Sequence, residues 1–234
     1  MADEPKGTGP RTREPQYQVC LDIERQEGLA RFGLMSNQVW RDDPRRLVFL
    51  LSRYKFVAKM LSGRRGILEV GCADAFGTRL VLQEVTDLTA VDFDPIFVQD
   101  ARDRMDARWP YAVHVHDMLE GPVPGSFEGA YALDVLEHIP QELEARFIGN
   151  VVRSLTADGV LIVGVPSIQS QVHASPPSRA GHVNCMDDTR LREVMSRFFH
   201  NTFIFSMNDE VVHTGFAPMA NYLIALCCSK REAF

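Results

Sequence analysis

Apolar and polar positions along the middle of the chain alternate between two periods. Short apolar runs, typical of buried strands, stand between longer runs whose apolar positions recur at helical spacing. The expected strands are 66–70, 88–92, 111–115, 129–133 and 159–165, and the expected helices between them are 77–86, 95–108 and 140–155. Short strands separated by helices predict a parallel sheet that is covered by helices on both faces.

The last third of the chain has a different pattern. A helix at about 188–199 is followed by two strand-like runs, NTFIFSM and ANYLIALCC, joined by a polar segment. We expect the last of these strands to run antiparallel to its neighbours. The predicted fold class is therefore α/β: a Rossmann-like, doubly wound, mostly parallel seven-stranded sheet with an antiparallel last strand.

The length of 234 residues suits one α/β domain with additions at its N-terminus. Residues 1–16 hold mainly proline, glycine and charge, and we expect a disordered tail. Two N-terminal helices are expected within 17–62. Asp43 can cap the second of them, and Pro44 suits its first turn. The main domain is expected to span 63–234.

Composition and charge exclude several classes of protein. The net charge of −6 argues against sequence-independent nucleic-acid binding, which needs an excess of lysine and arginine. No apolar run is long enough for a membrane span, and no leader is evident, so we expect a cytoplasmic protein without membrane partners. The five cysteines form no C-x-x-C pair. Histidine and acid residues near the sheet edge could ligate a divalent metal, but they form no compact ligand motif, so a metal stays only as an alternative and none is expected.

The segment ILEVGCADAFGTRLV, residues 67–81, is the first candidate for ligand binding. It begins as a buried strand, breaks at Gly71 and resumes as a helix-forming run, as loops that bind nucleotides do. The pattern Gly71, Ala73, Ala75, Gly77 departs from the G-x-G-x-x-G of dinucleotide loops, in which glycine lets the backbone approach a pyrophosphate. An NAD(P)-dependent oxidoreductase therefore stays only as an alternative.

Carboxylates occur where four of the predicted strands end: Glu69, Asp92, Asp117 and Asp134. Ligands of open α/β sheets lie beyond the carboxyl ends of the strands, so these groups should converge on one edge. Four negative charges would repel a pyrophosphate. They suit S-adenosylmethionine, which carries a sulfonium, an ammonium and two ribose hydroxyls but no phosphate.

Five segments in order, EVGCADAFG, TAVDFDPIFVQDA, HDML, FEGAYALDVLEHIP and GVLIVGVPS, resemble the successive motifs of class I S-adenosylmethionine-dependent methyltransferases. The resemblance covers roughly residues 66–166. It implies that S-adenosyl-L-methionine is the cofactor and that the backbone around Gly71 and Ala73 holds its methionine part. It also implies that Asp92 accepts from the ribose hydroxyls, that Phe93 flanks the adenine, and that Asp117 with Met118 receives the adenine amino edge.

Three further residues complete the expected cofactor set. Glu69 is expected either to bond loop amides or to hold the ligand's ammonium, and Cys72 and Asp134 adjoin the same region. The altered glycine loop leaves one more alternative, a non-catalytic partner subunit that binds S-adenosylmethionine without turnover.

The acceptor side of the site should come from three segments outside the cofactor motifs: 133–140, 166–186 and 206–222. They contain His138, His173, His182 and His213, and histidine can act as a general base because its pKa lies near working pH. We expect His182 and His213 to be the pair near the methyl group, with either one serving as base, and His138 to contribute nearer the cofactor. Asp209 and Glu210 stand four and three residues before His213, so either could orient its ring if the segment turns.

The C-terminal third is more distantly similar to bacterial methyltransferases found alongside enzymes of sugar and polysaccharide biosynthesis, in GHVNCM and SMNDEVVHTGFAPMANYLIALC. That resemblance, with polar acceptor segments, implies O-methylation of a sugar or another small hydroxylated metabolite. The chain is compatible with a homo-oligomer.

Overall fold

The computed structural model describes residues 9–232, and the chain divides into two compact units after Phe32. The first unit holds a 3-10 turn η1 (Pro15–Tyr17) and helix α1 (Gln18–Glu27), which has no buried residue. The expectation of a disordered tail lies, for residues 1–8, outside the described residues.

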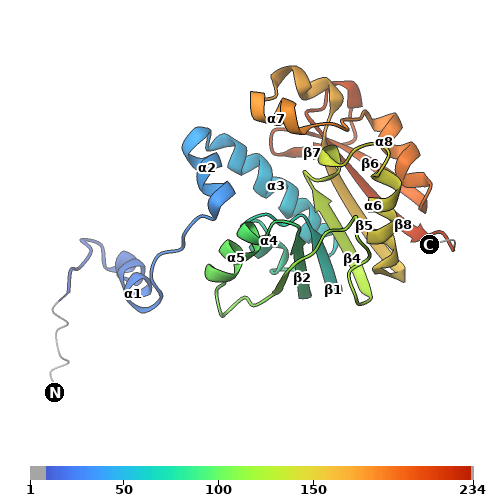
Figure 1. The fold of residues 1–234 in the computed structure, drawn as a ribbon. Coiled ribbons are helices and arrows are strands. Elements are labelled where there is room, and N and C mark those ends of the chain that lie inside the picture. The colour runs from blue at the N-terminus through green and yellow to red at the C-terminus, as the bar shows by residue number, and fades with distance from the viewer. Residues whose placement is uncertain (1–8, 233–234) are drawn as a thin grey trace. The chain divides into compact units, whose positions relative to one another are not determined.

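The second unit is an α/β sheet domain (Figure 1). Its strands are β1 (Arg65–Val70), β2 (Thr86–Asp92), β3 (Ala112–Val115), β4 (Phe127–Leu133), β5 (Leu155–Pro166), β6 (Phe199–Asn208), β7 (Val211–His213) and β8 (Tyr222–Lys230). Its helices are α2 (Leu34–Asp42), α3 (Arg45–Met60), α4 (Thr78–Val81), α5 (Pro95–Asp103), α6 (Glu144–Arg153), α7 (Pro176–Gly181) and α8 (Asp188–Ser196). The 3-10 turns are η2 (Leu136–His138), η3 (Ile168–His173) and η4 (Ala217–Met219).

The strand order within the described residues is β3-β2-β1-β4-β5-β8-β6-β7. Strands β1 to β5 pair in parallel, and β8 runs antiparallel to both β5 and β6. The Rossmann-like α/β fold and its antiparallel last long strand are thus confirmed. Because β5 and β6 are both antiparallel to β8, the segments that follow them leave the sheet at the same edge as the loop after β1.

The sheet separates two apolar cores. Leu68 of β1 and Ala130 of β4 face a core closed by α6 and α8, whereas Ile67 and Tyr131, one position away, face a core closed by α3, α4 and α5. This alternation follows from the two-residue period of a strand. Burial of each large apolar side chain contributes about 1.5–3 kcal/mol, so both helix layers are firmly attached.

The prediction of seven strands was wrong, because the described residues form eight. The extra strand β7 folds back on the end of β6, pairing Ser206 with His213 and Asn208 with Val211. Asp209 adopts φ 50° in the turn between them. Aspartate and asparagine tolerate this left-handed conformation better than most residues, so they allow a tight hairpin in a segment expected to be a loop.

Several helix predictions also need correction. Three α-helices precede β1 in the described residues, where two were expected, because α2 was not anticipated. The helix expected over 77–86 is the single turn α4, and that expected over 140–155 begins only at Glu144. The segment 166–186, expected as a loop, contains η3 and α7. None of the helices in residues 9–232 has the length and apolar character needed to cross a membrane.

Candidate functional site

The loop after β1 has a backbone conformation that favours glycine at three positions. Gly71, Ala73 and Ala75 have φ of 73°, 46° and 53°. A Cβ at Gly71 would lie 2.3 Å from Val135 Cγ2, so only glycine fits there. The loop backbone therefore lies against the segment that follows β4, at the point where the strand order reverses and ligands of such sheets bind.

Asp92, at the end of β2, holds this loop in place. Its Oδ2 accepts a hydrogen bond from the Ala73 amide at 2.8 Å, and its Oδ1 accepts one from the Asp94 amide at 2.9 Å. Each carboxylate oxygen can accept a further bond. Phe93 beside it is 73% exposed, which leaves its ring available to a ligand. Asp94 caps α5 by accepting from the Ile96 amide.

Glu69 lies buried under the loop and accepts no hydrogen bond from a loop amide. The expectation that it bonds loop amides was therefore wrong. Its carboxylate accepts from the hydroxyls of Tyr54 and Thr78, at 2.9 and 2.5 Å. Burial raises the pKa of Glu69 to about 7, although the hydrogen bonds from these hydroxyls act against that rise.

Asp74 was missed by the sequence analysis because nothing in its surroundings indicated a partner. It is buried, and its carboxylate accepts from the Ser36 amide at 2.7 Å and from the Phe76 amide at 3.1 Å. Ser36 belongs to α2, so this carboxylate attaches the unpredicted helix directly to the loop. A guanidinium nitrogen of Arg104 also donates to the Asp74 carbonyl.

Asp117 and Met118 follow β3 in a turn. The Asp117 carboxylate accepts from the Leu119 amide at 2.8 Å, which is the bonding of a turn residue, and Asp117 remains half-buried. Met118 is buried in the core under α6, and its carbonyl accepts from the Asn150 side chain. Cys72 is also buried, and burial raises the pKa of its thiol.

Asp134, directly after β4, forms an ion pair that was not predicted. Its carboxylate oxygens lie 2.6 and 2.8 Å from Arg53 Nη1 of α3. The Arg53 guanidinium in turn stacks on the Tyr222 ring at 3.7 Å. Asp134 also has φ 57°, the left-handed conformation that aspartate tolerates better than most residues. Helix α3, the end of β4 and the start of β8 are thereby joined at the carboxyl edge of the sheet.

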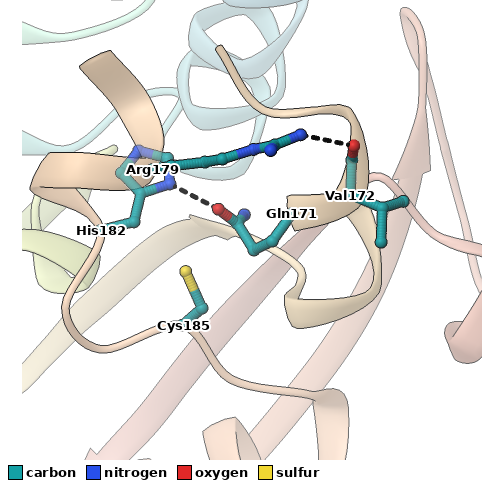
Figure 2. Close-up of a pocket in the computed structure, with 5 residues that line it drawn as sticks. All are labelled: Gln171, Val172, Arg179, His182 and Cys185. Carbon is teal, nitrogen blue, oxygen red and sulfur yellow. Dashed lines mark hydrogen bonds between the residues drawn. The ribbon is translucent and has the colours of Figure 1, made fainter. Parts of the chain in front are cut away.

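The structure brings His138 and His182 together. Their ring centroids are 5.1 Å apart, His138 Nδ1 lies 2.9 Å from the Gly181 carbonyl, and His182 Nδ1 lies 2.9 Å from Gln171 Oε1. Burial and the neighbouring His138 lower the pKa of His182, which favours its neutral form. His182 lines an open pocket of about 580 Å³. Figure 2 shows its ring pointing toward Gln171. The lining residues are Gln171, Val172, Arg179, His182 and Cys185.

His213 has contacts of its own within the β6–β7 hairpin. Its Nδ1 accepts from the Gly215 amide at 2.9 Å, and its Nε2 lies 2.8 Å from Asn208 Oδ1. The side chain that orients the ring is therefore Asn208, and the expected role of Asp209 or Glu210 was wrong. Both ring nitrogens are engaged.

Comparison with known proteins agrees with this geometry. Residues 67–159 match the family model described as a methyltransferase domain. A probable S-adenosylmethionine-dependent methyltransferase of Mycobacterium tuberculosis is 30% identical over 120 residues, which are 49% of this chain and 42% of that protein. The ubiquinone biosynthesis O-methyltransferase of Xanthomonas campestris pv. campestris is 29% identical over 137 residues, 55% of this chain and 57% of the relative. The chain thus spans about half the length of these curated relatives.

Among solved structures, the N-methyltransferase NodS from Bradyrhizobium japonicum, in complex with S-adenosylhomocysteine, has the same fold. The TM-score is 0.59 at 18% identity, over 89% of this chain and 97% of that one. At that identity the likeness shows the fold alone. The region that matches the family model, residues 67–159, is a methyltransferase domain, with S-adenosylmethionine as its cofactor.

Ala73→Gly is expected to raise the free energy of unfolding by about 1 kcal/mol, because it relieves a left-handed alanine. Ala75→Gly should gain less, since the buried Ala75 methyl packs in the core. Urea denaturation measures both. As a control, Ala145→Gly on the exposed face of α6 should lose about 0.5–1 kcal/mol. A lower free energy of unfolding in Ala73→Gly would contradict the inference that the left-handed backbone at Ala73 is strained.

Glu69 predicts a pH dependence of stability. Its pKa is about 7 in the folded protein against 4.5 ordinarily, so the folded state binds the proton more tightly. The free energy of unfolding should therefore fall as pH rises through this window, by on the order of 3 kcal/mol. Glu69→Gln should lack this component, measured by urea denaturation of the ligand-free protein at several pH values. An unchanged slope in Glu69→Gln, matching the exposed control Glu142→Gln, would refute it.

Proposed function

We propose that the chain transfers the methyl group of S-adenosylmethionine to a hydroxyl of a small polar acceptor, such as a sugar. The observation that carries the proposal is the meeting of His138 and His182 beside an open pocket to which Gln171 and Arg179 also contribute. The segments that bear them follow β4 and β5 at the edge of the sheet where the Gly71 loop also emerges. A flat aromatic acceptor would call for an aromatic lining, which the pocket residues do not provide.

The cofactor half of the site is proposed to follow the motif residues. The backbone at Gly71 and Ala73 would hold the methionine part, and Asp92 would accept from the ribose diol with the lone pairs that its two amide bonds leave free. Exposed Phe93 would flank the adenine, and Asp117 would receive its amino edge. Glu69, under the loop, would help to fix it, and an ammonium nearby would favour its ionised form.

The reaction needs no nucleophile from the protein. The methyl carbon is already activated by the sulfonium, so in-line placement of the acceptor oxygen and removal of its proton are the main tasks. We propose that His138 and His182 activate the acceptor hydroxyl. His213, with both ring nitrogens engaged, would shape the β6–β7 hairpin at the rim.

The direct test is incubation with labelled S-adenosylmethionine and a panel of nucleotide sugars and glycosides. Methylated product is expected for at least one acceptor, and His138→Ala and His182→Ala should each lower its formation by about 10²–10⁴-fold without changing cofactor affinity. His213→Ala should have a much smaller effect. His200, exposed at the far end of β6, provides the control variant. Tight cofactor binding without product from any acceptor would favour the non-catalytic alternative.

Asp92→Asn is expected to weaken S-adenosylhomocysteine binding by roughly ten- to a hundredfold, because it removes charge-assisted hydrogen bonds worth about 1.5–3 kcal/mol each. Calorimetry measures the affinity, and thermal unfolding separates it from damage to the loop that Asp92 also supports. Asp94→Asn is the matched control, since asparagine also caps helices and Asp94 only caps α5. Equal affinities in the two variants would contradict the assignment.

A further inference from the structure

A cluster of three side chains at the acceptor edge is arranged like a set of metal ligands. Glu137, His138 and His182 each offer one donor atom, and these atoms all lie within 4.8 Å of one another. Glu137 and His138 come from η2, whereas His182 follows α7, so the cluster forms only when the two segments meet. The three residues form no compact motif, so their spacing in the sequence does not predict that they meet.

The carboxylate of Glu137 lacks the partners that buried carboxylates normally have. Its side chain is fully buried, and neither of its oxygens has a hydrogen-bond partner among the described residues. Glu144, another buried glutamate nearby in the sequence, offers the contrast: its carboxylate accepts from Asn184 at 2.9 Å and from Arg190 at 2.8 Å. A buried carboxylate without donors is costly unless something absent from the chain itself binds it.

The two histidines are held as metal-binding histidines usually are. A carbonyl oxygen can only accept, so the contacts of His138 Nδ1 with the Gly181 carbonyl and of His182 Nδ1 with Gln171 Oε1 require Nδ1–H to donate in both rings. The lone pair of each neutral ring is then on Nε2, for which the described residues provide no hydrogen-bond partner. Ligating histidines characteristically donate their second ring N–H to a carbonyl or carboxylate in this way.

The backbone fixes the distance between the segments. The amides of Val183 and Asn184 both donate to the Glu137 carbonyl, at 2.9 and 3.0 Å. These bonds place His182 opposite η2 whatever the side chains do. The neighbouring Asp134 is already neutralised by Arg53, so it does not compete for a cation as a free charge would.

We propose that Glu137, His138 and His182 bind a divalent transition-metal ion, such as Zn²⁺ or Mn²⁺, through the carboxylate and the two Nε2 atoms. Two imidazoles and one carboxylate suit such ions, and three protein ligands leave a coordination position open. Small side-chain movements would bring the donors to about 2.0–2.2 Å from the ion.

The role of this ion rests on the proposed function. With their Nε2 atoms on the ion, the two histidines would activate the acceptor hydroxyl through the ion and would not take its proton themselves. A hydroxyl in the open position would lose its proton to solvent more readily, because a bound cation lowers the pKa of its oxygen ligand. The new carbon–oxygen bond forms as the sulfur–carbon bond breaks, which yields S-adenosylhomocysteine, the methylated acceptor and one proton. The ion undergoes no redox change. Val135, two positions before Glu137, touches the cofactor loop at Gly71, so the ion would lie beside the cofactor half.

The test is calorimetric titration of chelator-treated protein with Zn²⁺ and Mn²⁺, and absorption spectroscopy with Co²⁺ as the probe, in the absence of cofactor and acceptor. One ion per chain is expected, with a Co²⁺ spectrum that reports nitrogen and oxygen ligands. Glu137→Gln and His182→Ala should each weaken binding at least a hundredfold. Gln171→Ala, which removes only the support of His182, should weaken it about 10–100-fold. His200→Ala should bind as the wild type does.

Absence of binding at about millimolar metal, or binding that both Glu137→Gln and His182→Ala retain, would overturn the site. Circular dichroism and S-adenosylhomocysteine affinity check that the variants are folded. If Glu137→Gln does not fold, the metal affinity of Gln171→Ala tests the site, and an unchanged affinity in that variant would contradict it. Methyl transfer that continues at the full rate in metal-free protein would overturn the role of the ion while leaving the proposed function intact. If the wild-type protein binds the metal but methylates none of the tested acceptors, the metal site stands and only the proposed function is contradicted.

Discussion

The contact between the Gly71 backbone and Val135 determines how the two halves of the site meet. A side chain at Gly71 would overlap Val135, so the absence of a Cβ lets the loop after β1 rest on the segment after β4. Of the proposed cofactor residues, Gly71, Cys72 and Ala73 belong to that loop, and Glu137 and His138 of the proposed acceptor side follow Val135 closely in the sequence. Any substitution that separates the two segments would move the acceptor oxygen from the methyl carbon, and methyl transfer is sensitive to such displacement.

Buried carboxylates give this edge of the sheet its chemical character, and their partners distinguish their roles. Asp92 accepts from backbone amides, which are fixed donors and hold the loop without side-chain freedom. Glu69 accepts from two hydroxyls, and these neutral donors only partly offset its desolvation, so its pKa stays high. Glu137 has no donor among the described residues and is the most costly of the three to ionise without a ligand. The three carboxylates therefore differ in how far the protein itself offsets the cost of their burial, most for Asp92 and least for Glu137.

The sequence predicted what depends on local order and could not predict what depends on long-range contact. The five parallel strands and the position of Asp92 follow from period and spacing alone. Helix α2 has only Ser36 and Val39 buried, so its apolar stripe is too weak to be recognised. The Arg53–Asp134 ion pair joins residues 81 positions apart, and the meeting of His138 with His182 depends on how two loops fold over the sheet. Such pairs are set by tertiary packing, which residue spacing does not encode.

The segment from Ser167 to Met186 is attached firmly at its ends and loosely in its middle. Ser167 forms a bridge to Met186, and its hydroxyl donates to the Ala220 carbonyl at 2.5 Å. Between these ends, η3 and α7 contain no buried residue. Segments with few buried contacts open at low free-energy cost, and those with anchored ends return to one position. His182 stands where the exposed part rejoins the anchored part, and the amides of Val183 and Asn184, which donate to the Glu137 carbonyl, fix its place opposite η2 even if η3 and α7 move.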